Sequence, residues 1–452
     1  MKMFQQKSFW ILTSLVLFIG YWISCTKHDQ ILTVNDTTDN SSVLQSIKVT
    51  TAPTIDGTID PAWDNATKLD ILPTVPDPGN GLFSGYSGQQ FHATVRSMYD
   101  AQNIYFLAEI QDATQSVNVA PWYFNPAGNV TDKTGWTKEP SSNTYDASGV
   151  LSRAGWGQDR IAMLWNIDNS TPKFISQTCY ASCHVFTPYL DYTTGTGIME
   201  SNASEGNHYT NGAAEKIDMW WGRLGYMSKD ASLHFMDDNY QDWAGGPAIT
   251  NLTGGNANGR HVDGIVPDGT SSSTWPNRPN YTKSPTQGEV SNSQSLKLDG
   301  TGAKVNVPIW VIPGAGSAGY ILVADTTGGN AKKVTGVSST GMLTLSDGST
   351  INPTVGTDYQ RSGDATGATA KNSIPGYIGV PLIGERADIT GASVYTGTGW
   401  IVEYKRALKT ADVLKQDIDF SSLEDQVFGI AIWNNSNYQH GIQPNLTLTF
   451  KK

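Results

Sequence analysis

Residues 160–167 of this 452-residue chain are RIAMLWNI, a short β-rich run with polar residues beside it. Similar runs recur between clusters of Gly, Pro, Asn and Asp, at Ser46–Thr51, Phe91–Tyr99, Ile104–Ile110, Val307–Ile312, Trp400–Arg406, Phe428–Trp433 and Leu446–Phe450. Helical patterns are short, and the best are Pro61–Ala66 and Thr410–Leu414. Many strands with few helices between them favour antiparallel pairing over βαβ units. We therefore expect an all-β fold, an antiparallel β-sandwich with long loop insertions and few short helices.

The composition fits a folded protein that does not bind nucleic acid. Gly and Pro number 46 and 21, and hydrophobic residues make up 38% of the chain, enough for an ordinary core. Thirty Lys and Arg against 41 Asp and Glu give a net charge of −11. Such a charge would repel a phosphate backbone, so we expect no nucleic-acid partner.

The N-terminus has the pattern of an export signal. Lys2 and Lys7 precede the apolar run Phe9–Ile23, which is followed by Ser24 and Cys25. The run is short for a membrane-spanning helix. It resembles a bacterial lipoprotein signal, which implies cleavage after residue 24 and lipidation of Cys25. We expect an exported lipoprotein, anchored on a membrane and facing the periplasm or the cell exterior; an ordinary secreted or membrane-anchored form is the alternative.

The rest of the chain divides by composition. Residues 25–46 are polar and without periodicity, which is typical of a flexible tether. Residues 47–452 are predicted to form one domain with insertions at about 185–300 and 314–367. The second insertion contains three short runs, YILVAD, KKVTGV and MLTLSD, that favour small hairpins.

Cysteine and histidine are concentrated at one point, Cys179-Tyr-Ala-Ser-Cys183-His184. A Cys-x-x-Cys-His run is the attachment signature of c-type haem, and here the spacer is one residue longer. We predict one covalent haem c, with thioether bonds at Cys179 and Cys183 and His184 on the iron. The alternatives are a disulfide, which an export compartment permits, and another type of metal site, for which two thiols are few.

A family resemblance rests on several motifs in order. Residues 155–184, with DRIAMLW leading to the Cys/His run, resemble the haem-binding domain related to the γ subunit of ethylbenzene dehydrogenase. The likeness continues at DMWWGR (218–223), at 399–408, at 428–434 and at 438–440. The opening at 55–63 is similar also to family 9 carbohydrate-binding modules. The resemblance implies one sandwich domain with one haem. The enzyme-subunit branch holds haem b inside a molybdenum enzyme complex, whereas the paired thiols here resemble a c-type branch.

The resemblance also supplies candidates for the rest of the haem site. His440 lies in the turn where the resembling subunits place their second axial ligand, a Lys, so we predict His184 and His440 as the metal ligands. Other candidates for the second ligand are His92, His208, His234, His261, Met163, Met199, Met219 and Met227. Arg223 is expected to pair with a haem propionate, with a surface salt bridge as the alternative.

Tryptophans and acidic residues admit two interpretations each. Trp220 is a candidate wall of the haem pocket, but for it and for Trp63, Trp165, Trp221, Trp243 and Trp400 we favour burial in the core. The acidic residues Asp237, Asp238 and Asp242 offer oxygen ligands for calcium, although we favour a solvated loop.

Taken together, these patterns predict a lipid-anchored monohaem c-type cytochrome that passes single electrons. Its expected partners are redox proteins, either other cytochromes or an oxidoreductase whose haem subunit it would be; a stand-alone enzyme with an open iron site is a further alternative. A lipid-anchored carbohydrate-binding module without haem is the alternative from a different class, suggested by residues 55–63 and the 14 tryptophans.

Overall fold

The computed structural model describes residues 42–75, 85–117, 119–125, 135–141, 144–145, 151–153, 157–172, 174–178, 189–191, 196–198, 210, 214–228, 230–242, 259–271, 279–283, 286–299, 302–314, 320–353, 373–437 and 439–452. Cys25, Cys179, Cys183, His184, Met199, His208 and Trp243 lie outside these residues. Residues Ser42–Lys452 form one unit by their contacts.

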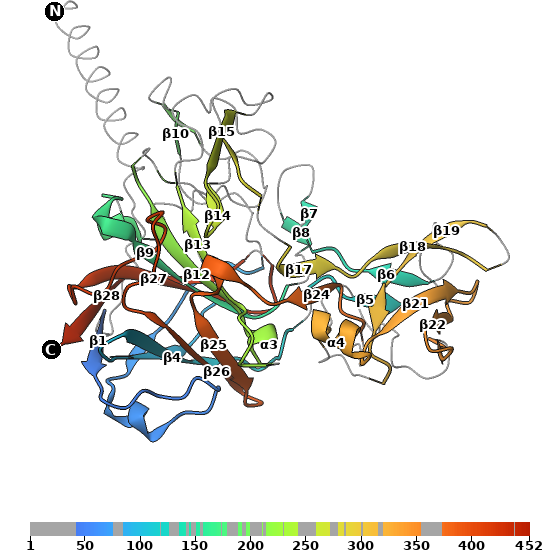
Figure 1. The fold of residues 1–452 in the computed structure, drawn as a ribbon, viewed down its shortest axis with the longest axis horizontal. Coiled ribbons are helices and arrows are strands. Elements are labelled where there is room, and N and C mark those ends of the chain that lie inside the picture. The colour runs from blue at the N-terminus through green and yellow to red at the C-terminus, as the bar shows by residue number, and fades with distance from the viewer. Residues whose placement is uncertain are drawn as a thin grey trace, which may run out of the picture. The chain divides into compact units, whose positions relative to one another are not determined.

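One large sheet organises the described residues (Figure 1). Its strands are, in order across the sheet, β14 (Arg260–Val262), β13 (Met236–Gln241), β12 (Ile217–Arg223), β9 (Arg160–Asn166), β27 (Gln426–Trp433), β28 (Gly441–Lys451), β1 (Val43–Lys48), β3 (Ala93–Tyr99), β4 (Asn103–Gln111), β26 (Gly399–Ala407) and β25 (Thr390–Tyr395), with β2 (Leu69–Ile71) beside β3. The all-β prediction is confirmed. The pairing is antiparallel except at β1, which runs parallel to both β28 and β3.

Helices among the described residues are short. They are α2 (Phe174–Gln177), α3 (Leu224–Met227), α4 (Val323–Gly328) and the 3₁₀ turns η1 (Pro61–Asn65), η2 (Ile167–Asn169) and η4 (Gly384–Ala387). The helix expected at Thr410–Leu414 is absent, because Asp412 accepts hydrogen bonds from the backbone of Leu414 and Gln416 and folds the segment into a turn. No helix among the described segments is long and apolar enough to cross a membrane.

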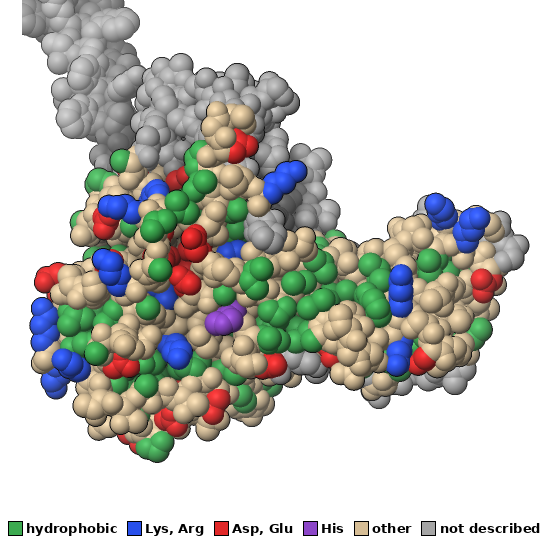
Figure 2. Space-filling model, viewed as in Figure 1, with side chains coloured by type: hydrophobic (Ala, Val, Ile, Leu, Met, Phe, Trp, Pro, Cys, Tyr) green, Lys and Arg blue, Asp and Glu red, His purple; other side chains and the backbone are tan. Residues whose placement is uncertain are grey.

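Smaller sheets lie outside the main sheet, and most of them enclose a second hydrophobic core. They are β5 (Trp122–Phe124) with β6 (Trp136–Lys138), β17 (Gly288–Ser291) with β24 (Tyr377–Val380), β18 (Gln294–Lys297) with β19 (Lys304–Val307), and β20 (Trp310–Val311), β21 (Lys332–Val337), β22 (Leu343–Leu345) and β23 (Thr350–Ile351). Trp122, Trp136 and Val337 are buried in this core. Figure 2 shows hydrophobic side chains gathered on the surface near α4 and β24.

Three further pairs are short: β7 (Thr144–Tyr145) with β8 (Leu151–Arg153), β10 (Tyr189–Asp191) with β11 (Thr196–Ile198), and β15 (Pro267–Ser271) with β16 (Pro279–Tyr281). The expected strand 307–312 is divided between β19 and β20, because Pro308 lacks the amide hydrogen that a continuous strand would use. In the expected 314–367 insertion, KKVTGV forms β21 and pairs with β22, but the end of YILVAD begins α4.

The interval 185–300 differs from the expected insertion. It contributes β12 and β13, two long strands of the main sheet, whose every residue is buried. Their sequences, IDMWWGR and MDDNYQ, are too polar to predict buried strands, and Asp218 and Asp237 are buried because each is paired with an arginine. The fold also begins earlier than residue 47, since Leu44 on β1 is fully buried against β28 and β3.

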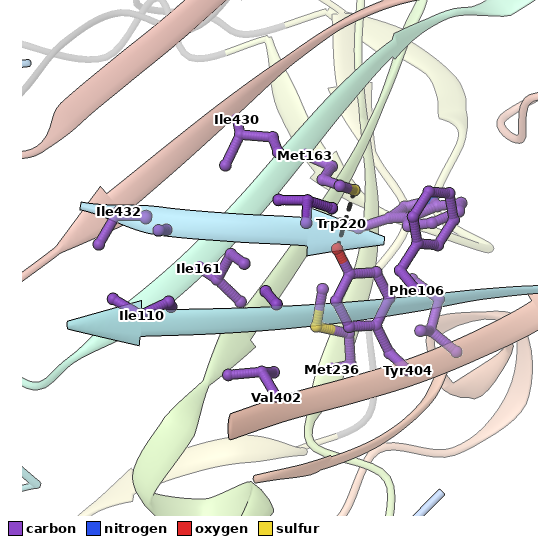
Figure 3. Close-up of a cluster of buried hydrophobic side chains, with 14 of the residues drawn as sticks. Phe106, Ile110, Ile161, Met163, Trp220, Met236, Val402, Tyr404, Ile430 and Ile432 are labelled. Atoms are coloured by element: carbon purple, nitrogen blue, oxygen red, sulfur yellow. Dashed lines mark hydrogen bonds between the residues drawn. The ribbon is translucent and has the colours of Figure 1, made fainter. Parts of the chain in front are cut away.

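The main sheet curls so that its two ends pack face to face. Tyr404 on β26 donates a hydrogen bond to Met163 Sδ on β9 (3.0 Å), and Phe106 on β4 packs against Trp220 on β12 (Figure 3). Arg406 on β26 donates to Asp218 Oδ2 on β12 at 2.7 Å, and neither side chain has exposed surface. This ion pair joins strands from opposite ends of the sheet.

Replacing Arg406 by Met should destabilise the protein strongly. The change leaves Asp218 buried without its cation, which typically costs about 3–5 kcal/mol of unfolding free energy. Lys409→Met is the matched control, because Lys409 pairs with Asp419 at 2.8 Å but is 68% exposed. Loss of such a pair costs about 1 kcal/mol or less. Urea unfolding of the two variants measures the difference, and equal losses would contradict a central role for Arg406.

Candidate functional site

The strands β9, β12 and β27 present a second face away from the main core, called here the outer face. Side chains alternate across a strand, and the pairing register aligns Arg160 with Arg223 and Ala162 with Trp221. Small and apolar side chains form a buried cluster on this face: Ala162, Leu164, Phe174, Ile217, Met219, Trp221, Ala431 and Ile442.

Three arginines surround Trp221. Their guanidinium carbons lie 4.3 Å (Arg223), 4.8 Å (Arg160) and 4.9 Å (Arg260) from the Trp221 ring. These distances are those of cation–π contacts. The outer face therefore combines an aromatic surface with concentrated positive charge.

The positive charge is only partly compensated. Arg223 Nε lies 3.4 Å from Glu289 Oε2, but Arg223 Nη1 is buried without a hydrogen-bond partner in the described part of the chain. Burial lowers the pKa of Arg160 to about 9, with attraction from Glu289 opposing the shift and repulsion from Arg223 adding to it. An anionic ligand would relieve this repulsion and satisfy the unpaired nitrogen.

His440 borders the outer face in the turn between β27 and β28. Its ring stacks on Trp433, with centroids 4.3 Å apart and planes 25° from parallel. The same turn is fixed to β9, because Arg160 Nη2 donates to Asn437 Oδ1 at 2.6 Å. Gly157 allows the close approach: a Cβ there would lie 1.9 Å from the carbonyl carbon of Ser436. The turn is thus held against the start of β9.

The segment that leads to the Cys/His run is anchored on the same face. Phe174 of α2 is fully buried in the outer-face cluster. Four residues later, Thr178 Oγ1 accepts a hydrogen bond from the backbone amide of Asn445 on β28 (3.2 Å). Cys179 follows Thr178 directly in the sequence, but it lies outside the described residues with Cys183 and His184.

Trp220 differs from the expectation that it lines a cofactor pocket. It is fully buried in the main core, where it packs against Phe106, Trp165 and Phe420. Side chains alternate along β12, so Trp220 points into the core while Trp221 and Arg223 lie on the outer face. The favoured core interpretation holds for Trp220, and Trp221 is the tryptophan beside the arginines.

The alternative axial ligands are dispersed. His92 is exposed just before β3, His234 contacts the carbonyl of Ile389, and His261 contacts Asp242 at 3.1 Å. Met163 and Met227 belong to the main core, whereas Met219 lies in the outer-face cluster. Of these described candidates, His440 and Met219 are the ones on or beside the outer face.

The solvated-loop interpretation of Asp237 and Asp238 is wrong. Both lie on β13, and their residues are 2% and 0% exposed. Asp237 binds Arg386 through two hydrogen bonds of 2.6 and 2.7 Å, and Asp238 faces Arg406 in the interior. The sequence predicts a loop here because strands are predicted mainly from hydrophobic residues, and MDDNYQ contains few of them.

Arg160, Arg260 and Trp433 were not predicted as site residues. Alternation alone would have placed Trp221 and Arg223 on one face of a strand. To place Arg160 on the same face, one must know that β9 pairs with β12. To place Arg260 there, one must know that β13 pairs with β14. These long-range pairings have no local sequence signal.

Fold and site define an all-β protein whose outer sheet face places three arginines around one tryptophan. The chain belongs to the ethylbenzene dehydrogenase family, whose model matches residues 60–444. This membership supports a domain related to haem binding and electron transfer. No curated protein matched the chain.

Two solved structures align with the chain at low similarity. Both are of a family 9 carbohydrate-binding module from Caldicellulosiruptor kristjanssonii. The complex with glucose covers 90% of this chain and 95% of its own, with 8% identity and a TM-score of 0.26. The complex with cellotriose covers 90% and 93%, with 9% identity and a TM-score of 0.26.

Proposed function

We propose that this protein is an exported, lipid-anchored cytochrome with one covalent haem c on the outer face, and that it transfers single electrons. The observation that carries the proposal is the convergence on that face of Thr178, which adjoins Cys179, of His440, and of the arginines around Trp221. Family membership supports the same class of function.

The segment before Cys179 and the His440 turn are connected through one strand. Thr178 is bonded to Asn445, and His440 lies five positions before Asn445 along the chain. The segment that enters the Cys/His run is therefore bonded to β28, and the His440 turn leads directly into the same strand.

The residues available suit each part of the group. Cys179 and Cys183 would supply the thioether bonds, and His184 and His440 the axial nitrogens. Arg160 and Arg223 would pair with the carboxylates of the propionates through charge-assisted hydrogen bonds. Haem bound in this way supplies reversible one-electron oxidation and reduction, with a lower potential for two His ligands than for a Met and a His.

The protein around the site would control access and potential. The buried apolar cluster with Trp221 and Ala431 excludes water from one side. Trp433 stacks on His440 and restricts rotation of its ring. Reduction adds an electron to the haem, and the positive charge of the arginines would stabilise that electron. The arginines would therefore favour the reduced haem. An axial His440 would leave little room for a substrate, which fits an electron carrier or the haem subunit of an oxidoreductase complex.

Covalent attachment is tested first. Protein made in a host with cytochrome c maturation should keep its haem after denaturation and acid-acetone extraction, because thioether bonds survive both. Cys179→Ser combined with Cys183→Ser should release the haem into the supernatant. A wild-type precipitate without colour would show that the attachment is not covalent.

The axial role of His440 is tested by absorption and electron paramagnetic resonance spectra. His440→Ala should convert low-spin six-coordinate iron to high-spin iron that binds carbon monoxide or imidazole. His92→Ala is the control, because His92 is exposed before β3, and its spectra should stay unchanged. Low-spin spectra in His440→Ala would assign the ligand elsewhere, with Met219 on the outer face as the next candidate.

The anchor is tested at Cys25. We expect this residue to be the acylated N-terminus, so Cys25→Ser should move the protein from the membrane fraction to the soluble fraction. The haem spectrum should not change, since the substitution lies outside the domain. Sedimentation with membranes in high salt after this substitution would refute a lipid anchor at Cys25.

A further inference from the structure

A second group of ionisable side chains lies inside the main core, on the other face of β12. One carboxylate oxygen from each of Asp218, Asp238 and Asp417 lies within 4.8 Å of the other two. Asp218 and Asp238 are 0% exposed, and Asp417 is 8% exposed. A fourth carboxylate, Asp263, is 6% exposed and interacts with Asp417 and Asp218. These four residues are called here the carboxylate cluster.

The negative charge of the carboxylate cluster exceeds the positive charge of Arg406, the cation beside it. Arg406 Nη1 lies 2.7 Å from Asp218 Oδ2, 3.7 Å from Asp238 Oδ2 and 3.6 Å from Asp417 Oδ1. If all four carboxylates were ionised, the single guanidinium would leave three negative charges in the interior. Burying such charge without compensation costs several kcal/mol per ion.

Several oxygens of the cluster also lack a hydrogen-bond donor among the described residues. Both oxygens of Asp238 are buried without one, and so is Asp218 Oδ1, whereas Asp263 and Asp417 share a hydrogen bond with each other. Asp238 is the clearest case, because its whole side chain is enclosed and faces the other carboxylates. Buried polar atoms normally have partners, and an unpartnered group inside a protein often marks an ion or water.

We propose that the carboxylate cluster binds one calcium ion. Calcium is bound by six to eight oxygens at 2.3–2.6 Å, so two of its ligands are at most about 5 Å apart. The separations within 4.8 Å in the cluster meet this limit. Magnesium needs shorter distances of 2.0–2.1 Å, and zinc prefers nitrogen and sulfur. The ion would reduce the net charge of the cluster from −3 to −1.

The surroundings of the carboxylate cluster are also acidic. Burial, with repulsion from Asp218 and other carboxylates, raises the pKa of Asp238 well above its usual value, and the pKa of Asp218 is raised to about 6. Repulsion from Asp417 likewise contributes to raising the pKa of Asp388 to about 6. Acidic side chains also gather on the surface near β12 and β13 (Figure 2), which would attract a cation toward the cluster.

Calcium titration of the metal-depleted full chain tests the proposal. After dialysis against a chelator, the wild type should bind one calcium per chain in equilibrium dialysis. Its Tm should rise by about 5 °C at a calcium concentration 100 times the dissociation constant. Magnesium at the same concentration should give a smaller rise. The calcium proposal does not depend on the haem proposal, so calcium binding should be observed whether or not the protein has a haem spectrum.

Two variants of β13 separate calcium binding from a structural role. Asp238→Asn should abolish the calcium-dependent rise in Tm, yet in chelator its Tm should equal or exceed that of the wild type, because an unpartnered buried carboxylate is removed. Asp237→Asn, one residue away on the opposite face, loses bonds to Arg386 and should lower Tm while keeping the calcium effect.

Three outcomes would overturn the proposal. The first is a wild type that binds no calcium. The second is an Asp238→Asn variant that keeps the full calcium effect. The third is a Tm that does not change with calcium concentration but rises as the pH falls from 7 toward 4. That last result would show that protons neutralise the cluster, because carboxyls with raised pKa values favour folding when protonated.

Discussion

The ion pair between Arg406 and Asp218 is the contact on which the closed sheet depends. One partner comes from β26 and the other from β12, so the pair fixes the distance between two ends of a single curled sheet. Trp220 and Phe420 pack against the same guanidinium, at 4.7 and 5.6 Å. The aromatic core is therefore built around a charge, and its packing determines where β12 lies and hence where the outer face lies.

Strand β12 separates two different chemical environments. Asp218 and Trp220 face the core, where carboxylates outnumber the one guanidinium among them, while Trp221 and Arg223 face outward, where arginines are in excess. Successive side chains of a strand point to opposite faces, so a shift of register by one position would exchange the two sets. The pairing of β12 with β9 and β13 over its whole length prevents that shift.

Local patterns predicted the strands with regular hydrophobic runs, such as β9, β26 and β27, and hence the fold class. They did not predict β13, because MDDNYQ is polar and owes its burial to Arg386 and Arg406 from distant parts of the chain. The family resemblance identified His440 as a candidate site residue. Arg160 and Arg260 could not be identified in this way, because only the order of strands in the sheet places them beside Trp221. Trp220 lies in the core, as favoured, and alternation along β12 assigns Trp221 to the outer face.

Strand β1 lies between β28 and β3, so the first strand of the domain pairs with the last. Val43 aligns with Thr447, nearly the full length of the domain away in sequence. A chain that emerges from a translocation channel with its N-terminus first cannot complete this sheet until the C-terminal strand has also emerged. In the exported cytochrome proposed above, closure of the main sheet would therefore be a late event, and a haem-attachment apparatus would meet Cys179, Cys183 and His184 before the sheet is complete.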